Sequence, residues 1–257
     1  MTNLEKLLIE KKYEYHWDND TIVVTHKGFI YLNSLKKIST NITFNNNGSV
    51  SLYSLKKIST NITFNNSGYV DLESLKKIST NITFNNKGDV SLNSLEEITT
   101  NIIFNNKGNV SLNSLKEITT NIEFNNKGSV SLYSLNKITT NIEFNNKENV
   151  SLYSLKEITT DIIFNNKGYV YLNSLKELNY FGKKYKIINI DGFTRIVIGT
   201  PKVKNGITIV KTRFLKGNGL TNCPISYIAL KDNYYSHGKT IKEAIDDLNF
   251  KLIKNNV

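Results

Sequence analysis

The residues that most often carry catalytic or metal chemistry are few in this chain and lie far apart. The histidines are His16, His26 and His237, and Cys223 is the only cysteine. No Cys/His set has the spacing of a metal site, and no serine-nucleophile, zinc-protease or dinucleotide-binding motif occurs. His237 stands alone in sequence, without a second ligand or an acid at ligand spacing. We therefore expect no catalytic residue, no metal and no cofactor.

Acidic residues recur in one column at twenty-residue intervals, at Glu97, Glu117, Glu157 and Glu177. Paired carboxylates carry out glycoside hydrolysis, and some β-helices use them in this way. A column that arises by repetition, however, usually varies without catalytic geometry. We interpret it as a solvated face and the chain as a non-enzyme, with a carbohydrate-active β-helix as an alternative.

The segment SHGKT, residues 236–240, ends like a phosphate-binding loop. The first glycine of such a loop would fall at position 233, where the chain has Asn233, so the motif fails. Thr240 followed three residues later by Glu243 instead predicts a capping box that opens a final helix.

Positive charge is concentrated after residue 180. Residues 1–180 hold 19 Lys and 17 Asp+Glu, a net charge of +2, whereas residues 181–257 hold 14 Lys+Arg and 5 acids, a net charge of +9. Alternation with apolar residues predicts that several cations share one sheet face, where they could contact phosphates while Tyr180, Phe181 or Tyr185 stack on bases. A solubilising surface is the alternative. The candidate cations are Lys183, Lys184, Lys186, Arg195, Lys202, Lys204, Lys211, Arg213 and Lys216.

A sequence repeat of twenty residues makes up most of the chain and must position its side chains. Its copies begin at Asn41, Asn61, Asn81, Asn101, Asn121, Asn141 and Asp161, after a degenerate copy from residue 21. Each copy keeps an I-x-F pair, the turn residues N-N-x-G, a V-x-L pair and an L-x-x-I step. The two pairs have strand period, so we predict two short strands per copy. The glycine suggests a positive φ, although Glu148 in its place means that this is either not obligatory or strained.

One copy cannot bury its six apolar side chains alone, so the copies must stack into a solenoid. Asparagines at one position of successive copies, Asn65 to Asn165, would then form an amide ladder. Both ends of a solenoid need covers. A short helix with Leu4, Leu7 and Leu8 on one face is expected at the N-terminus, and the tail at the other end.

The tail predicts a small α+β unit. Its strands are expected in YKIINI, FTRIVIGT, ITIVKTRFL and ISYIALKD, with hairpin turns at Asp191-Gly192 and Asn205-Gly206 and a helix in TIKEAIDDLNFKLIK. The fold class is thus β-rich: a leucine-rich-repeat-like β-solenoid of about eight 20-residue coils with a small C-terminal α+β domain. The expected divisions are a capping segment at 1–20, the solenoid at 21–178 and a basic α+β domain at 179–257.

If core positions are fixed, binding information resides in outward positions that differ between coils. The columns that flank V-x-L are rich in tyrosine, serine and asparagine, which adaptable binding surfaces use. We expect a partner-binding face there, against the alternative of a merely solvated sheet. Its candidate residues are Tyr31, Tyr53, Tyr69, Asp71, Glu73, Asp89, Tyr133, Tyr153, Tyr169 and Tyr171.

The L-x-x-I and V-x-L-x-S-L segments resemble the short bacterial type of leucine-rich repeat, although the asparagines follow Phe104 rather than the strand leucine. The tandem SLxxIxxNIxFNNxGxVxL with a terminal HGKTIKEAIDDL resembles proteins carried by phages, prophages and mobile elements of low-GC bacteria. That resemblance implies an accessory protein, some relatives of which block host defence.

We therefore expect a non-catalytic protein that docks onto a host protein or nucleoprotein complex, such as a CRISPR effector, with contact to RNA or DNA through the tail. A nucleic-acid-binding accessory protein and a structural or adhesive phage component are alternatives. The first twenty residues lack the apolar run of a signal peptide or membrane span, so a cytoplasmic location without membrane contact is expected.

Overall fold

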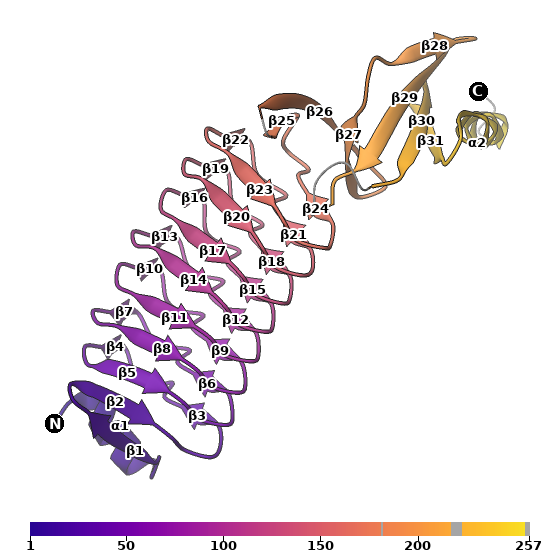
Figure 1. Ribbon diagram of the computed structural model, residues 1–257. Helices are drawn as coiled ribbons and strands as arrows, with labels where there is room; N and C mark the ends of the chain where they lie inside the picture. The colour runs from indigo at the N-terminus through magenta and orange to yellow at the C-terminus, as the bar shows by residue number, and fades with distance from the viewer. Residues whose placement is uncertain (181, 217–222, 255–257) are drawn as a thin grey trace.

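The structure, a computed structural model, describes residues 1–180, 182–216 and 223–254. Figure 1 shows a row of stacked coils with the N-terminal helix at one end and a sheet with a second helix at the other. Neither described helix is long and apolar enough to cross a membrane. The expected β-solenoid of about eight coils with a small C-terminal α+β region is confirmed.

The I-x-F pairs form the first face of the solenoid. Equivalent residues of successive coils pair in parallel register, as Ile102 does with Ile122 and Phe104 with Phe124. The first strand, which precedes the coils, is antiparallel to the second. The strands are β1 (Tyr15–Asp18), β2 (Thr21–Val24), β5 (Asn41–Phe44), β8 (Ile62–Phe64), β11 (Ile82–Phe84), β14 (Ile102–Phe104), β17 (Ile122–Phe124), β20 (Ile142–Phe144) and β23 (Ile162–Phe164).

The V-x-L pairs form the second face, a parallel sheet in which Val110 pairs with Val130. Its strands have two residues each because the chain turns again directly after them. They are β3 (Ile30–Tyr31), β6 (Val50–Ser51), β9 (Val70–Asp71), β12 (Val90–Ser91), β15 (Val110–Ser111), β18 (Val130–Ser131), β21 (Val150–Ser151) and β24 (Val170–Tyr171).

The prediction of two strands per coil was wrong, because the L-x-x-I step supplies a third. Its apolar residues are buried in nearly every coil, as Leu115 and Ile118 are, so this segment must lie against the core and run beside its copies. The pairing is broken into short stretches of two or three strands. These strands are β4 (Lys37–Ile38), β7 (Lys57–Ile58), β10 (Lys77–Ile78), β13 (Glu97–Ile98), β16 (Glu117–Ile118), β19 (Lys137–Ile138) and β22 (Glu157–Ile158).

One column of stacked phenylalanines runs through the core. The rings of Phe84 and Phe104 have centroids 5.0 Å apart and lie within 11° of parallel, and every neighbouring pair from Phe44 to Phe164 stacks in the same way. Tyr180 continues the column at 6.4 Å from Phe164. Identical coils therefore place each phenylalanine on the phenylalanine of the next coil, and the offset stacking of the rings stabilises the core beyond the burial of apolar surface.

The two asparagines of each turn make different hydrogen bonds. The first forms the predicted ladder, in which Asn125 Nδ2 donates to Asn105 Oδ1 at 3.3 Å. The second is buried, and Asn126 Nδ2 donates to the carbonyls of Gly108, Gly128 and Ser129 at 3.1, 3.0 and 3.3 Å. Turn carbonyls that face the core are thus satisfied by a side chain, as burial requires.

The glycine of N-N-x-G does not adopt a positive φ in any repeat. Crowding favours glycine instead: a Cβ on Gly128 would lie 2.5 Å from Asn109 Oδ1 and 2.6 Å from both Asn109 N and Gly108 C of the preceding coil. Positive φ is therefore not obligatory at this position, which answers the question raised by Glu148.

The N-terminal end is covered by α1 (Asn3–Glu10) and β1. Thr2 and Glu5 form a reciprocal capping box at the start of this helix. Leu4 and Leu8 are buried and Leu7 packs partly against them, so the predicted helix and its apolar face are confirmed.

The tail combines an antiparallel sheet with a helix. Both predicted hairpin turns form, with Asp191, Gly192, Asn205 and Gly206 all at positive φ. A further strand at 234–238, which the sequence analysis does not predict, pairs with the strand of ISYIALKD. The elements are β25 (Glu177–Tyr180), β26 (Lys183–Ile190), β27 (Phe193–Val197), β28 (Lys202–Lys204), β29 (Ile207–Phe214), β30 (Ile225–Lys231), β31 (Tyr234–Gly238) and α2 (Ile241–Lys254).

The tail covers the C-terminal end of the solenoid. Val170 N donates to Leu215 O at 3.0 Å and Leu172 N to Thr194 Oγ1 at 2.8 Å, so β24 has new partners where the next coil would lie. Leu178, Tyr180 and Ile187 join the solenoid core. The final helix packs instead on Ile207, Ile209 and Ala229 of the sheet.

Candidate macromolecular interface

The V-x-L face is the side of the solenoid whose outward residues vary most from coil to coil. It comprises three columns: the residues before V, between V and L, and after L. These 24 positions contain three acids and no lysine or arginine, in a chain whose net charge is +11. The ten residues predicted for partner binding all lie on this face. The absence of cations on this face contrasts with the net positive charge of the whole chain.

The aspartates on this face accept hydrogen bonds from the backbone of the solenoid. Asp89 Oδ1 accepts the backbone N–H of Asn109 at 2.7 Å, and Asn149 Oδ1 accepts that of Tyr169 at 2.8 Å in the same column. Asp71 accepts the N–H of Glu73 at 3.1 Å. Asp89 and Asn149 therefore link successive coils, whereas the bond from Glu73 to Asp71 lies within one coil.

The aromatic residues form a continuous cluster where the solenoid meets the tail, which we call the junction patch. It consists of Tyr133, Tyr153, Tyr169, Tyr171, Phe193 and Phe214. Ring centroids are 5.2 Å apart for Tyr133 and Tyr153, 5.6 Å for Tyr153 and Tyr171, and 5.0 Å for Tyr169 and Phe193. Tyr133 is 45% exposed and the other five are half-buried. Such an arrangement offers a large, pre-ordered contact surface.

Two cations border the junction patch. Lys216 Nζ lies 4.5 Å from the centroid of Tyr169, and the Arg195 guanidinium lies 4.0 Å from that of Phe214. Arg195 is buried and Nη1 donates to Ser226 Oγ at 2.6 Å, which fixes the plane on which Phe214 rests. Burial lowers the pKa of Arg195, and the negative charge of Asp191 opposes this. Burial, with the phenols of Tyr153 and Tyr169, raises the pKa of Tyr171, so its hydroxyl stays protonated at neutral pH.

The nine tail cations do not share one sheet face. Cross-strand partners lie on the same face, and pairing of Lys202 with Ile209 and of Lys204 with Ile207 places those lysines on the α2 side. Arg195 pairs with Phe214 and lies on the opposite side. Several of the cations thus lie on one side, since Lys211 lines the same cavity as Lys202 and Ile209, but the nine as a whole do not, because alternation within each strand does not fix the register that joins the strands. Phe181, a predicted stacking residue, lies outside the described residues.

Individual cations also differ in availability. Lys184 is paired with Glu177 at 2.5 Å, and Lys183 lies 5.4 Å from the ring centroid of Tyr185. Lys202, Lys204 and Lys211 are exposed, whereas Arg213 and Lys216 are half-buried and Arg195 is buried. Tyr180 is buried in the core and Tyr185 packs partly against it, so only a part of the predicted patch can contact a nucleic acid directly.

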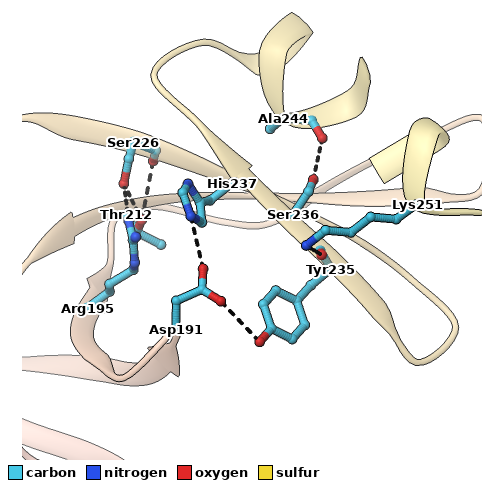
Figure 2. A network of polar contacts seen from close by, with 9 residues as sticks. All are labelled: Asp191, Arg195, Thr212, Ser226, Tyr235, Ser236, His237, Ala244 and Lys251. Carbon is cyan, nitrogen blue, oxygen red and sulfur yellow. Dashed lines mark hydrogen bonds and ion pairs between the residues drawn. The ribbon is translucent and has the colours of Figure 1, made fainter. Parts of the chain in front are cut away.

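His237 is not alone, as its sequence context had suggested. Its Nε2 lies 2.9 Å from Asp191 Oδ2, and Tyr235 Oη donates to Asp191 Oδ1 at 3.3 Å (Figure 2). Asp191 comes from the β26–β27 turn, 46 residues earlier in the chain, so no local motif reveals the pair. The side chains of His237 and Asp191 are 49% and 43% exposed, and among described residues no serine, cysteine or threonine hydrogen bonds to His237. Within the same residues, no three His, Cys, Asp or Glu side chains are grouped so as to hold a metal.

Capping of the last helix is confirmed with one change. Thr240 Oγ1 accepts the N–H of Glu243 at 3.1 Å, but the Glu243 carboxylate accepts the N–H of Lys239, at 2.8 Å, rather than that of Thr240.

Sequence reasoning missed Phe193 and Phe214 as members of the junction patch. Phe193 directly follows the predicted Asp191-Gly192 turn, so a strand start was foreseeable. Its contact with Tyr169 depends on how the tail docks, which no local signal encodes. Comparison with models of protein families, with curated proteins and with solved structures found no match.

Proposed function

We propose that this chain is a non-catalytic binding protein that docks onto a protein partner through the V-x-L face and the junction patch. The observation that supports it is the junction patch itself: six clustered rings with a bordering lysine. Tyrosine, other aromatic residues and arginine dominate the energetics of protein interfaces, because they bring large area at low entropic cost. Rings that already contact one another lose less freedom on binding.

Charge favours a protein over a nucleic acid on this face. Phosphate backbones are bound through several Lys or Arg contacts, and the three columns of the V-x-L face contain none. Asp71, Glu73 and Asp89 would repel phosphates and attract a basic protein surface. The resemblance to phage-borne repeat proteins would make the chain an accessory protein of a phage or mobile element that acts in the cytoplasm on a host protein or nucleoprotein complex, a defence effector included.

The test is affinity capture from a lysate of bacterial host cells, with and without nuclease. The tagged protein is compared with a Tyr153→Ala/Tyr171→Ala variant and with Phe250→Ala, which removes an exposed ring of α2. We expect one protein to be retained by the parent and by Phe250→Ala, to be absent with the double variant, and to be insensitive to nuclease. The proposal would be refuted if Phe250→Ala loses the retained protein while the double variant keeps it, or if the parent retains no protein with or without nuclease.

A second candidate function, nucleic-acid binding by the tail, is supported by the exposure of Lys202, Lys204 and Lys211. It predicts salt-dependent retention on DNA that is abolished by neutralising these lysines and Arg213. The logarithmic salt slope should fall by about one for each phosphate that the variant no longer binds. Retention that is unchanged in that variant would exclude this function.

A further inference from the structure

The third face of the solenoid ends in an open strand edge. Ser174 still follows the coil path, since its N and Oγ both donate to Tyr153 O, at 3.1 and 2.7 Å. Beyond it the chain leaves this path: Lys176 O accepts the N–H of Ile187 at 2.8 Å, and β25 pairs antiparallel with β26. Within the described residues, β22 therefore pairs with β19 on one side and with no strand on the other.

The open edge presents two carbonyls. In the preceding coil, Asn136 O accepts the N–H groups of Lys156 and Glu157 at 2.9 and 3.2 Å, and Ile138 O accepts that of Thr159 at 3.1 Å. The equivalent carbonyls of Lys156 and Ile158 have no donor among the residues that the structure describes.

Ile158 also lacks the apolar cover that its column has elsewhere. The six preceding isoleucines, from Ile38 to Ile138, are at most 4% exposed, whereas Ile158 is only partly buried. Pairing on this face is interrupted at two earlier steps as well, yet Ile78 and Ile118 at those steps stay buried. In the described part of this face, the last step alone combines an unpaired edge with a partly exposed isoleucine.

A cleft of about 680 Å³ lies along this edge, between β22 and the β25–β26 hairpin. Its charged lining residues are Lys156, Lys176, Lys184, Lys186, Glu157 and Glu177. Both glutamates already have cations, Glu157 with Lys137 at 3.1 Å and Glu177 with Lys184 at 2.5 Å. Among described residues Lys156, Lys176 and Lys186 form no ion pair, so the cleft has an excess of positive charge.

We propose that this cleft binds an extended acidic peptide segment of another protein, which adds as a strand to β22. The amides of an extended chain can donate to the carbonyls of Lys156 and Ile158, alternate carboxylates can meet the lysines, and an apolar side chain between them can cover Ile158. Main-chain bonds and alternating side-chain pockets are how strand addition binds peptides.

A nucleic acid fits this site less well than a peptide. Phosphates accept hydrogen bonds and would leave two carbonyl acceptors without donors, and a sugar–phosphate chain does not cover an isoleucine. The cleft lies on a different face from the V-x-L face, and its occupation does not depend on the partner of that face.

The test uses a short fluorescein-labelled peptide of alternating glutamate and valine, with fluorescence anisotropy as the readout. Saturable binding is expected to the full chain, and Lys156→Glu/Lys186→Glu should weaken it at least about tenfold, because two attractions become repulsions. Lys116→Glu, in the same column as Lys156 but two coils earlier, should change the affinity less than about twofold. Melting curves establish that both variants are folded.

Two further probes separate strand addition from simple charge attraction. The same peptide with alternate amides methylated keeps its carboxylates but lacks those donors, and it should bind at least about tenfold more weakly. Hydrogen exchange at residues 156–159 should slow when the unmethylated peptide is bound. Equal binding of the methylated peptide, equal loss with Lys116→Glu, displacement by an oligouridine of the same charge, or no binding at all would each overturn the proposal.

Discussion

Replacement of Gly128 by alanine tests the claim that the stacking of coils, rather than a turn conformation, favours glycine in N-N-x-G. A Cβ at this position would lie 2.5 Å from Asn109 Oδ1 and 2.6 Å from Asn109 N and Gly108 C. Two of these atoms belong to the backbone of the preceding coil, so they cannot move away without disturbing the hydrogen bond of 3.1 Å from Gly128 N to Gly108 O.

The expected magnitude is a balance of two effects. Overpacking in a close-packed interior costs about 1–3 kcal/mol. Alanine also narrows the unfolded ensemble, which stabilises a protein by about 0.4–1 kcal/mol where the backbone permits it. Because the φ of Gly128 is not positive, this second effect applies in full. We expect a net loss of about 0.5–2 kcal/mol in the free energy of unfolding.

The assay is urea unfolding followed by circular dichroism, with the m-value checked for constancy. The matched control is Glu148→Ala, which places the same residue at the equivalent position of the next coil, where a Cβ is already present. It should change stability by less than about 0.5 kcal/mol. If Gly128→Ala stabilises the protein, the crowding argument is refuted and glycine is dispensable there.

Three further predictions concern the interior. Asn126→Ala, which removes a donor to three turn carbonyls, should lower the free energy of unfolding by about 1–3 kcal/mol. Asn125→Ala in the exposed ladder should lower it by less than about 1 kcal/mol in the same assay, and equal losses would contradict the different roles of the two asparagines. Phe104→Ala should cost about 3–5 kcal/mol, since the ring is fully buried between two others, while Phe29→Ala, at 53% exposure, should change the unfolding midpoint little. Burial raises the pKa of Cys223, so at a given pH the thiolate fraction is smaller in the folded protein than in the unfolded one. The reaction of this thiol with a disulfide reagent, followed by absorbance, should be at least about tenfold slower in the folded protein than in urea. An equal rate would place this thiol at the surface.

The solenoid could be predicted from sequence because its information is local and repeated. Six apolar positions at fixed spacing, such as Ile102 and Phe104, define which side chains point inward, and identity between copies fixes the register. The asparagine ladder follows from the same pattern, and the covering helix follows from the helical spacing of Leu4, Leu7 and Leu8. Hairpins at Asp191-Gly192 and Asn205-Gly206 were predictable because both turns need residues that tolerate positive φ.

Features that depend on contacts between distant segments could not be predicted. The role of Gly128 is set by the preceding coil rather than by its own turn. The pairing of His237 with Asp191, the burial of Arg195 and the entry of Phe214 into the junction patch all depend on strand register and docking in the tail. The open edge at β22 exists because β25 leaves the coil path, and no residue pattern within the repeat predicts this departure.

Site-specific photo-crosslinking tests the proposed binding function most directly. A benzoyl-phenylalanine replaces Tyr153 in the junction patch or, as a control, Glu143 on the I-x-F face, and cells that express each protein are irradiated. We predict one dominant cross-linked protein from position 153 and none from position 143. The same cross-linked protein from both positions, or from position 143 alone, would contradict the assignment of partner binding to the V-x-L face.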